Sequence, residues 1–326
     1  MAQSEEITHL RILVTGAAGF LGSHLVDFLL KKGHQVIGID SFQTGSPANL
    51  EHLEKNSKFK LISHNIQMPL EGLGLENIDQ IFNLACPASP IHYQRDPIST
   101  LKTCFQGIEN ILELAKANKI CVLHTSTSEV YGDPQVHPQP ESYWGNVNPF
   151  GARSCYDEGK RVAEALCYAY QEKYPDLQIR IARIFNTYGP RMAHSDGRVV
   201  SSFIGDALAG QPIKITGDGT ATRSFQYITD CVEGLYRLMN SDYAAPVNIG
   251  NPGEFKIREF AEIIVDMVAE LGMPRVPITY LPRPADDPNT RKPDITRAKE
   301  VLGWEPEVKL KDGLVETIKW HMEQSR

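Results

Sequence analysis

The chain has 326 residues, of which 41% are hydrophobic and 22% are charged, and its formal net charge is −7. This balance is typical of an ordinary globular protein with enough residues for one large or two modest domains. The negative net charge argues against nucleic acid as a partner.

Six cysteines are scattered along the chain without a C-x-x-C pair, and the ten histidines show no metal-binding spacing. This pattern favours free thiols in a reducing compartment and predicts neither a disulfide framework nor a metal site. The first ten residues lack the basic and apolar regions of a signal peptide, and no segment approaches the roughly 18 apolar residues of a membrane span. We therefore expect a cytoplasmic protein with no membrane partner.

A glycine-rich turn follows the first apolar run, Arg11–Thr15, with Gly16, Gly19 and Gly22 at intervals of three. Such a turn lets the backbone approach a pyrophosphate at the N-terminus of the following helix. The next strand, Gln35–Asp40, ends in an acid 18 residues after Gly22. That acid suits the ribose diol of NAD and would repel a 2′-phosphate. The alternative is an ordinary strand-to-helix turn.

Strand and helix patterns alternate through the first half of the chain. The predicted strands are Arg11–Thr15, Gln35–Asp40, Phe59–Ser63, Gln80–Leu84, Val122–Ser126 and Arg180–Arg183. The predicted helices are Gly22–Lys32, Thr100–Ala117 and Tyr156–Tyr174. Repeated units of this kind predict an α/β fold, a Rossmann-type doubly wound parallel sheet whose ligands bind beyond the carboxyl ends of its strands.

Tyr156 and Lys160 stand four residues apart in the third of these helices and therefore share a face. A lysine ammonium beside a phenol favours the phenolate, so this tyrosine is expected to exchange a proton below its free pKa of about 10. Alone, such a pair is equally compatible with a solvated helix surface. Its presence downstream of the glycine turn favours a catalytic pair.

The second half is less regular and richer in proline and glycine. Helices are predicted at Val200–Ala209, Thr229–Asn240, Ile257–Leu271 and Leu310–Met322, a strand at Pro246–Ile249, and a loop over Val276–Arg291. Because the strand at Pro246–Ile249 can rejoin the first sheet, we assign residues 1–186 and 226–250 to the cofactor-binding domain. Residues 187–225 and 251–326 are expected to form a smaller, mixed α/β substrate-binding domain.

The glycine turn, Asp40 and the Tyr156–Lys160 pair together resemble the extended short-chain dehydrogenase/reductase family, and the resemblance runs from end to end. Within it, the chain is most similar to the UDP-glucuronate decarboxylases, also called UDP-xylose synthases. The runs that carry the closer match are Leu84–Pro90, Ser126–Pro134, Ser154–Lys160, Ala182–Arg191, Asp196–Val200 and Asp287–Asp294.

The resemblance implies an NAD-dependent decarboxylation of UDP-glucuronate to UDP-xylose through a transient 4-keto sugar, with NAD recycled. It implies that Tyr156 removes the proton of the C4 hydroxyl, assisted by Lys160 and the hydroxyl of Thr127. It also implies a homodimer in which the helices Thr100–Ala117 and Tyr156–Tyr174 pair across a two-fold axis.

Three further residues concern the carbon that loses CO₂. Ser128 stands where related dehydratases carry an aspartate that protonates a departing hydroxyl, and a decarboxylase has no such hydroxyl to expel. Glu129 is expected as an acid/base or as a neighbour of the substrate carboxylate; the alternative is an ordinary loop carboxylate. Arg291 is expected to hold the sugar or assist protonation; the alternative is a surface pair with Lys292.

The resemblance also carries over the binding residues. Those expected at the cofactor are Gly16, Gly19, Phe20, Leu21, Gly22, Asp40, Leu84, Lys102, Tyr156, Lys160, Thr187 and Arg198. Those expected at the UDP-sugar are Pro87, Ser89, Asn186, Lys214, Arg223 and Tyr227, with the Arg223 guanidinium on the diphosphate.

The chain departs from the family pattern at three positions. Cys104 and Asn65 stand where relatives typically carry asparagine and aspartate, and Ala152 interrupts an otherwise matching run. Two other functions stay open. One is another nucleotide-sugar epimerase or dehydratase, although epimerases usually lack a glutamate at position 129. The other is a silent NAD-binding sensor, although such proteins usually lose the tyrosine or the lysine.

Overall fold

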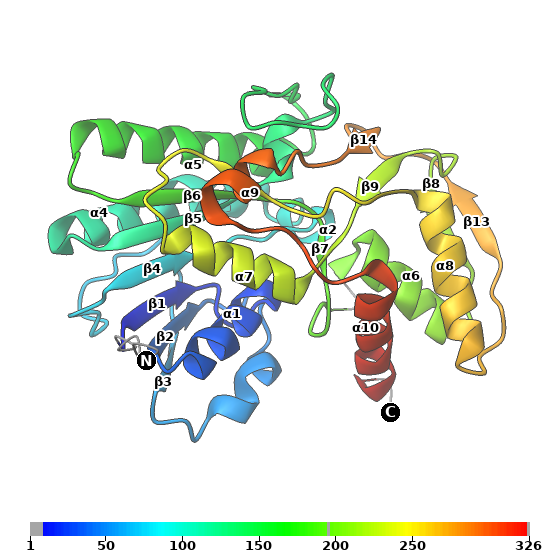
Figure 1. The fold of residues 1–326 in the computed structure, drawn as a ribbon, viewed down its shortest axis with the longest axis horizontal. Coiled ribbons are helices and arrows are strands. Elements are labelled where there is room, and N and C mark those ends of the chain that lie inside the picture. Colours follow the sequence, from blue (N-terminus) through cyan, green and yellow to red (C-terminus); the bar gives the residue numbers. More distant parts are fainter. Residues whose placement is uncertain (1–8, 194–195, 325–326) are drawn as a thin grey trace, which may run out of the picture.

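A seven-stranded parallel sheet forms the centre of the larger part of the molecule, with the strand order β11-β6-β5-β4-β1-β2-β3 (Figure 1). This computed structural model describes residues 9–193 and 196–324, so the N-terminal residues 1–8 lie outside the described part. The strands are β1 Arg11–Thr15, β2 Gln35–Asp40, β3 Phe59–Ser63, β4 Gln80–Asn83, β5 Cys121–Thr127, β6 Ile179–Ile184 and β11 Val247–Ile249. The order reverses between β1 and β4, which opens a crevice at the carboxyl ends of the strands.

Helices cover both faces of this sheet, as the alternating pattern predicts. The first face carries α1 (Phe20–Lys31), α7 (Ile228–Met239) and α9 (Thr296–Leu302), which share one hydrophobic core. The second face carries α4 (Ile108–Asn118) and α5 (Ser154–Lys173), which share another. The Rossmann-type fold expected from the sequence is therefore confirmed.

The predicted helix Thr100–Ala117 is built from three segments. They are α3 (Pro97–Lys102), a π-helical turn (Thr103–Gly107) and α4. Single π turns in α-helices are frequent at functional sites. Short helices stand at three other loops: η1 Pro47–Leu53, α2 Pro90–Tyr93 and η3 Ser128–Tyr131.

A smaller unit lies beside the large sheet, on the right of Figure 1. Its strands are β7 Thr187–Tyr188, β8 Ile213–Thr216, β9 Thr222–Ser224, β10 Gln226–Tyr227, β12 Glu254–Lys256, β13 Ile278–Leu281 and β14 Thr290–Arg291. Its helices are α6 Val199–Leu208, α8 Ile257–Glu270 and α10 Leu310–Gln324. These helices and strand β8 share a third hydrophobic core, which includes Phe203, Phe260, Ile213 and Leu314.

The expected loop over Val276–Arg291 is wrong at both ends. Strand β13 pairs in parallel with β8, and β14 pairs in parallel with β9. Both strands are short, and the segment between them is rich in proline and aspartate, so their pairing depends on distant partners rather than on local propensity. The strand predicted at Pro246–Ile249 is present as β11 and pairs with β6.

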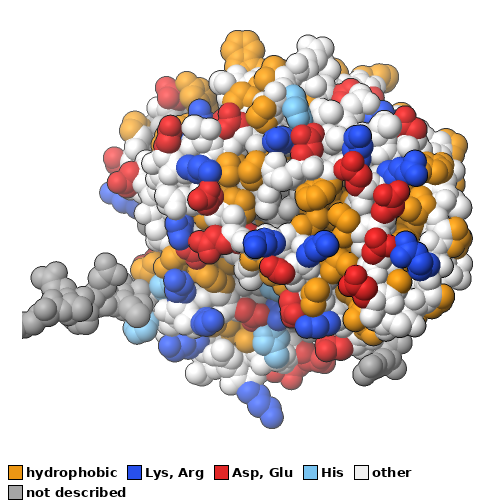
Figure 2. Space-filling model, turned by 45° about the vertical axis from the view of Figure 1, so that its right-hand side comes forward, with side chains coloured by type: hydrophobic (Ala, Val, Ile, Leu, Met, Phe, Trp, Pro, Cys, Tyr) orange, Lys and Arg blue, Asp and Glu red, His pale blue; other side chains and the backbone are white. Residues whose placement is uncertain are grey.

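The surface shows no feature that contradicts the composition. On the face drawn in Figure 2, basic and acidic side chains are interspersed among hydrophobic ones. Within residues 9–193 and 196–324, no helix has the length and hydropathy needed to cross a bilayer. The same described residues contain no cluster of histidine, cysteine and acidic side chains suited to a metal ion.

Candidate active site

A cavity of about 690 Å³ opens at the carboxyl ends of the sheet, between the two units. Its walls include the glycine turn after β1, the end of β5, the start of α5 and residues of the smaller unit. A second hollow of about 70 Å³, lined by Asp40, shares Gly16 and Gly19 with the large one. The two hollows therefore meet at the glycine turn.

The glycine turn has a geometry that side chains would not allow. Gly16 has φ +69°, and a Cβ at Gly22 would lie 2.0 Å from the Gly16 carbonyl oxygen. Helix α1 begins directly after Gly19, which provides no side-chain cap for the first N–H groups. The turn thus places the first backbone N–H groups of α1 at a positive helix end.

Asp40 lies beside this turn and is almost fully buried. Its carboxylate accepts hydrogen bonds from the backbone N–H groups of Ala18 and Phe42, both at 2.8 Å. Burial raises the pKa of Asp40, while these N–H groups act in the opposite direction. The carboxyl therefore has a fixed orientation in the small hollow.

Tyr156 and Lys160 occupy one face of α5, and both are buried. The Lys160 ammonium donates to the Thr125 carbonyl oxygen at 2.8 Å and lies 6.0 Å from the centre of the Tyr156 ring. The Tyr93 ring stacks on the Tyr156 ring, with centroids 4.9 Å apart and planes 3° apart. The phenol is thus held between α2 and the end of β5.

In the protein alone, burial outweighs the effect expected of Lys160 on the pKa of Tyr156. Burial raises the pKa of Tyr156 well above its ordinary value, and Cys86 acts in the same direction. A hydrogen bond with Thr127 acts in the opposite direction. The hydrogen bond that the Lys160 ammonium donates is to the Thr125 carbonyl oxygen.

Glu129 is held between two arginines. Its carboxylate lies 2.5 Å from Arg291 Nη1 and 2.5 Å from Arg153 Nη2. Arg291, which is 1% exposed, also donates to Ser128 Oγ at 3.3 Å and to the Gly132 carbonyl oxygen at 2.9 Å. This pairing joins β14 of the smaller unit to the end of β5.

Burial alone would raise the pKa of Glu129, but Arg291 and Arg153 outweigh it and lower the pKa to about 2. The pairing therefore stabilises the fold above about pH 4, and its contribution is lost as the pH falls towards 2. At neutral pH this side chain is a carboxylate with no proton to donate. The acid role expected for Glu129 has no support in this geometry, whereas a place beside the substrate carboxylate stays a prediction.

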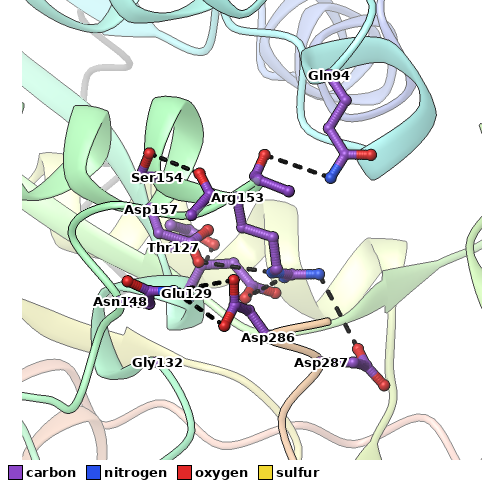
Figure 3. A network of polar contacts seen from close by, with 12 residues as sticks. Gln94, Thr127, Glu129, Gly132, Asn148, Arg153, Ser154, Asp157, Asp286 and Asp287 are labelled. Carbon is purple, nitrogen blue, oxygen red and sulfur yellow. Dashed lines mark hydrogen bonds and ion pairs between the residues drawn. The ribbon is translucent and has the colours of Figure 1, made fainter. Parts of the chain in front are cut away.

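Arg153 links Glu129 to two further acids, as Figure 3 shows. Its Nε lies 3.5 Å from Asp157 Oδ2, and its Nη1 lies 4.0 Å from Asp287 Oδ1. Arg223 Nη2 contacts Asp287 Oδ2 at 3.2 Å. Burial and Glu129 raise the pKa of Asp157 to about 7, against Arg153 and Arg291.

Comparison with known proteins gives the chain its relatives. The family model described as GDP-mannose 4,6 dehydratase matches residues 13–317. UDP-glucuronic acid decarboxylase 5 of Arabidopsis thaliana is 54% identical over 308 residues, which are 94% of this chain and 88% of that protein. UDP-glucuronic acid decarboxylase 1 of Danio rerio is 53% identical over 95% of this chain and 72% of that protein. The chain belongs to the UDP-glucuronic acid decarboxylase family.

Solved structures outside this decarboxylase family share its fold. The UDP-glucuronic acid 4-epimerase of Bacillus cereus, solved with UDP-glucuronic acid and NAD, is 30% identical with a TM-score of 0.86, over 97% of this chain and 100% of that one. The dTDP-glucose 4,6-dehydratase of Streptomyces venezuelae is 27% identical with a TM-score of 0.87, over 96% of this chain and 97% of that one. The same scaffold therefore serves related chemistries.

The structure brings most of the site residues predicted for a decarboxylase to these two hollows. Those that line the large cavity are Gly16, Gly19, Phe20, Leu21, Gly22, Leu84, Ser89, Thr127, Ser128, Glu129, Tyr156, Lys160, Asn186, Thr187, Arg198, Lys214 and Arg223. Asp40 and Pro87 line the small one. Arg291 lies behind the wall, in contact with Ser128 and Glu129.

Lys102 and Tyr227 line neither hollow. Lys102 is exposed at the end of α3, and Tyr227 packs edge-on against Tyr188 at 5.5 Å. The structure therefore places both away from the cavity, and their assigned roles stay predictions.

Sequence reasoning missed Tyr93, Arg153, Asp157 and Asp287 as parts of this site. One available signal was the spacing of Arg153 and Asp157, which are four residues apart at the start of a helix. No local pattern marks Tyr93 or Asp287, because each reaches the cluster through tertiary packing.

The departures from the family pattern also lie near the cavity. Cys104, on the π-helical turn, has its sulfur 3.4 Å from that of Cys86. The hydrogen bond with Cys104, together with Lys160, lowers the pKa of Cys86. Asn65 lines the small hollow, and the exposed Ala152 offers its carbonyl oxygen to Gln94.

We predict that Arg291→Met destabilises the fold by about 3 kcal/mol, because it removes one partner of the buried Glu129 carboxylate. Urea unfolding measures the decrease in the free energy of unfolding. The control is Arg258→Met, which breaks an exposed ion pair with Glu262 and should cost at most about 1 kcal/mol. Adding Glu129→Gln to Arg291→Met should recover part of the loss. Equal losses for Arg291→Met and the control would contradict the pairing.

Proposed function

We propose that the protein is an NAD-dependent UDP-glucuronate decarboxylase, which produces UDP-xylose through a 4-keto sugar. The observation that carries this proposal is the 54% identity to a UDP-glucuronic acid decarboxylase over 94% of the chain. The site supports it, because Ser128 replaces a dehydratase acid and lies beside the Arg291–Glu129 pair.

The residues at the glycine turn fit NAD. The positive φ of Gly16 and the lack of room for a Cβ at Gly22 create a close backbone approach for a pyrophosphate. The Asp40 carboxylate, fixed by two N–H groups beside this turn, suits a ribose diol. When bound, NAD supplies a hydride acceptor that later returns the hydride. Tyr156 and Lys160 line the other part of the same large cavity.

The chain's own groups account for proton transfer at C4. Tyr156 is the group that takes the hydroxyl proton, and Thr127 is hydrogen-bonded to it. Because burial raises the pKa of Tyr156, the free protein holds the phenol protonated. The Lys160 ammonium, 6.0 Å from the centre of the Tyr156 ring, is the nearby positive charge that favours deprotonation of the phenol.

The second set of groups suits a sugar carboxylate. Arg153 and Arg223 line the cavity, and Arg291 stands behind Ser128. Guanidinium groups bind carboxylates and phosphates through paired hydrogen bonds. This division leaves C4 to the Tyr156 centre and the carboxylate to the arginine cluster.

Incubation with UDP-glucuronate, followed by mass spectrometry of the nucleotide sugar, tests the proposed function. A decarboxylase yields a product lighter by CO₂. The fold neighbours include an epimerase and a dehydratase. A product of unchanged mass would indicate an epimerase instead, and a product that has lost water would indicate a dehydratase.

We expect Tyr156→Phe to reduce turnover at least about a hundredfold, because it removes the exchangeable proton while keeping the ring. Binding of NAD and UDP-glucuronate, measured by calorimetry, should stay nearly unchanged. Tyr168→Phe is the matched control, since Tyr168 lies on the same helix and is 64% exposed. Near-normal turnover of Tyr156→Phe would reject its role at C4.

Asp40 should make the protein prefer NAD strongly over NADP, because its carboxylate repels a 2′-phosphate. We expect Asp40→Ser to bring the dissociation constants of NAD and NADP closer together, as measured by calorimetry with each dinucleotide. Asp79→Asn is the control, since Asp79 caps the opposite end of the sheet through the Arg11 N–H group. Equal binding of NAD and NADP by the unmodified protein would refute the assignment.

We propose that the protein is a homodimer that buries exposed apolar side chains of α3, the π-helical turn and α5. Ile98, Phe105 and Tyr168 on this surface are 69%, 45% and 64% exposed. In a dimer with a two-fold axis, two copies of such a surface pack against each other and are removed from water. Ile98→Glu with Phe105→Glu should yield monomers in sedimentation experiments, whereas Leu271→Glu, an exposed position on another helix end, should not. Monomers of the unmodified protein at micromolar concentration would exclude the dimer.

A further inference from the structure

Asp157 is a buried carboxyl that the proposed chemistry does not use. It lies in the first turn of α5, directly after Tyr156, and is 5% exposed. Its Oδ1 atom is buried and has no hydrogen-bond partner among the described residues. A buried carboxyl oxygen without a partner is costly when ionised, so the position needs an explanation.

The surroundings of Asp157 are dominated by one cation and one anion. Arg153, one turn earlier, approaches Asp157 Oδ2 to 3.5 Å through an Nε that makes no hydrogen bond. Glu129 from η3 takes the other end of the same guanidinium. Arg291 from β14, Tyr93 from α2 and the adjacent Cys155 complete the titratable groups that act on this site.

Arg153 is therefore shared by three acids, of which Glu129 also pairs with Arg291 and Asp287 also pairs with Arg223. Asp157 has its ion pair with Arg153. The distance from the guanidinium to the carboxylate is 2.5 Å for Glu129, 3.5 Å for Asp157 and 4.0 Å for Asp287. Of this cluster, Arg153, Glu129 and Asp287 line the large cavity, whereas Asp157 lies behind them. An anion that enters the cavity beside Arg153 would add a further negative charge to the same guanidinium.

We propose that Asp157 is a positioning residue that takes up a proton when the carboxylate of a UDP-sugar binds beside Arg153, and releases it when that carboxylate leaves. The proposal rests on the proposed function, because it assigns UDP-glucuronate as the incoming anion. Neutralising Asp157 removes one competitor for Arg153, so the guanidinium can turn its free donor towards the substrate.

The proton count follows from the reaction. Replacing a carboxylate by hydrogen, with release of CO₂, consumes one proton from solvent. Proton uptake by Asp157 at binding precedes the loss of the carboxylate and is separate from the proton that C5 receives. When CO₂ departs, the electron pair of the broken bond passes to the 4-keto sugar as an enolate, and the added negative charge is cancelled when C5 takes a proton. Asp157 then returns to the ionised form that pairs with Arg153.

Repulsion between like charges determines that binding of the substrate carboxylate raises the pKa of Asp157. Burial and Glu129 already raise the pKa of Asp157 to about 7. A second carboxylate nearby raises it further. At pH 7 the free protein holds about half a proton on this group, so binding should take up as much as about half a proton per site. At about pH 5 the group is already protonated, and the uptake should vanish.

Calorimetric titration in buffers of different ionisation enthalpy measures this uptake directly. The experiment uses the NAD-loaded protein carrying Tyr156→Phe, so that turnover is suppressed, with UDP-glucuronate as ligand and UDP-glucose as the ligand without a carboxylate. We expect uptake near pH 7 with UDP-glucuronate, little at about pH 5, and none with UDP-glucose.

Asp157→Asn should abolish the uptake while UDP-glucuronate still binds. Asp286→Asn is the matched control, since Asp286 is an exposed acid near the same cluster, hydrogen-bonded by Asn148, and should retain the uptake. Thermal unfolding of each variant verifies the fold. Should Asp157→Asn fail to fold, the comparison of the two ligands and two pH values decides without it.

The outcomes separate the two hypotheses. Binding of UDP-glucuronate without proton uptake, or uptake that persists in folded Asp157→Asn, overturns the role of Asp157 and leaves the decarboxylase proposal intact. Failure of UDP-glucuronate to bind overturns the role of Asp157, and the mass of the product formed by the unmodified protein decides the proposed function independently.

Discussion

The site depends on one partly buried carboxylate that two arginines neutralise. Glu129, at the end of β5, receives Arg153 from α5 and Arg291 from β14 at 2.5 Å each. Without these partners a carboxylate at this depth would be strongly destabilising. The requirement fixes the start of α5, and with it Tyr156, relative to the end of the sheet. It also fastens the smaller unit to the larger one at the position where the cavity opens.

Two electrostatic regions with different tasks share this cavity. Around Tyr156 the surroundings are aromatic and thiol-rich, and burial holds the phenol protonated. Around Arg153 the surroundings are ionic, and acids and guanidinium groups balance one another. The first region suits proton transfer at a carbon that bears a hydroxyl. The second suits an anionic substituent whose charge changes during the reaction, because a balanced ionic cluster can redistribute its pairs at low cost.

Local sequence patterns were sufficient for the large sheet but not for the smaller unit or the ionic cluster. Strands β1, β2 and β3 match their predicted bounds, since β1 and β2 are buried apolar runs and β3 is a short, partly apolar run at the sheet edge. Strands β13 and β14 lie in a stretch that resembles a loop, because their stability comes from pairing with β8 and β9. Most of the predicted ligand-binding residues line the cavity, and they were predicted from motifs of the family. Asp157 escaped prediction because its proton affinity arises from burial and from Glu129, a residue 28 positions away in sequence.

The separation of Arg291 from its partners bears on how the chain acquires its native state. Arg291 and Ser128 are 163 residues apart, so their contact closes a very long loop. During synthesis, β5 and the first turn of α5 leave the ribosome well before β14 exists. Until then Glu129 has only Arg153 as a partner, and the carboxyl end of the sheet lacks its cover. A nascent chain at this stage would expose the unfinished crevice to other chains. Roughly the last 40 residues cover it, so the chain most needs protection from aggregation while they are being made.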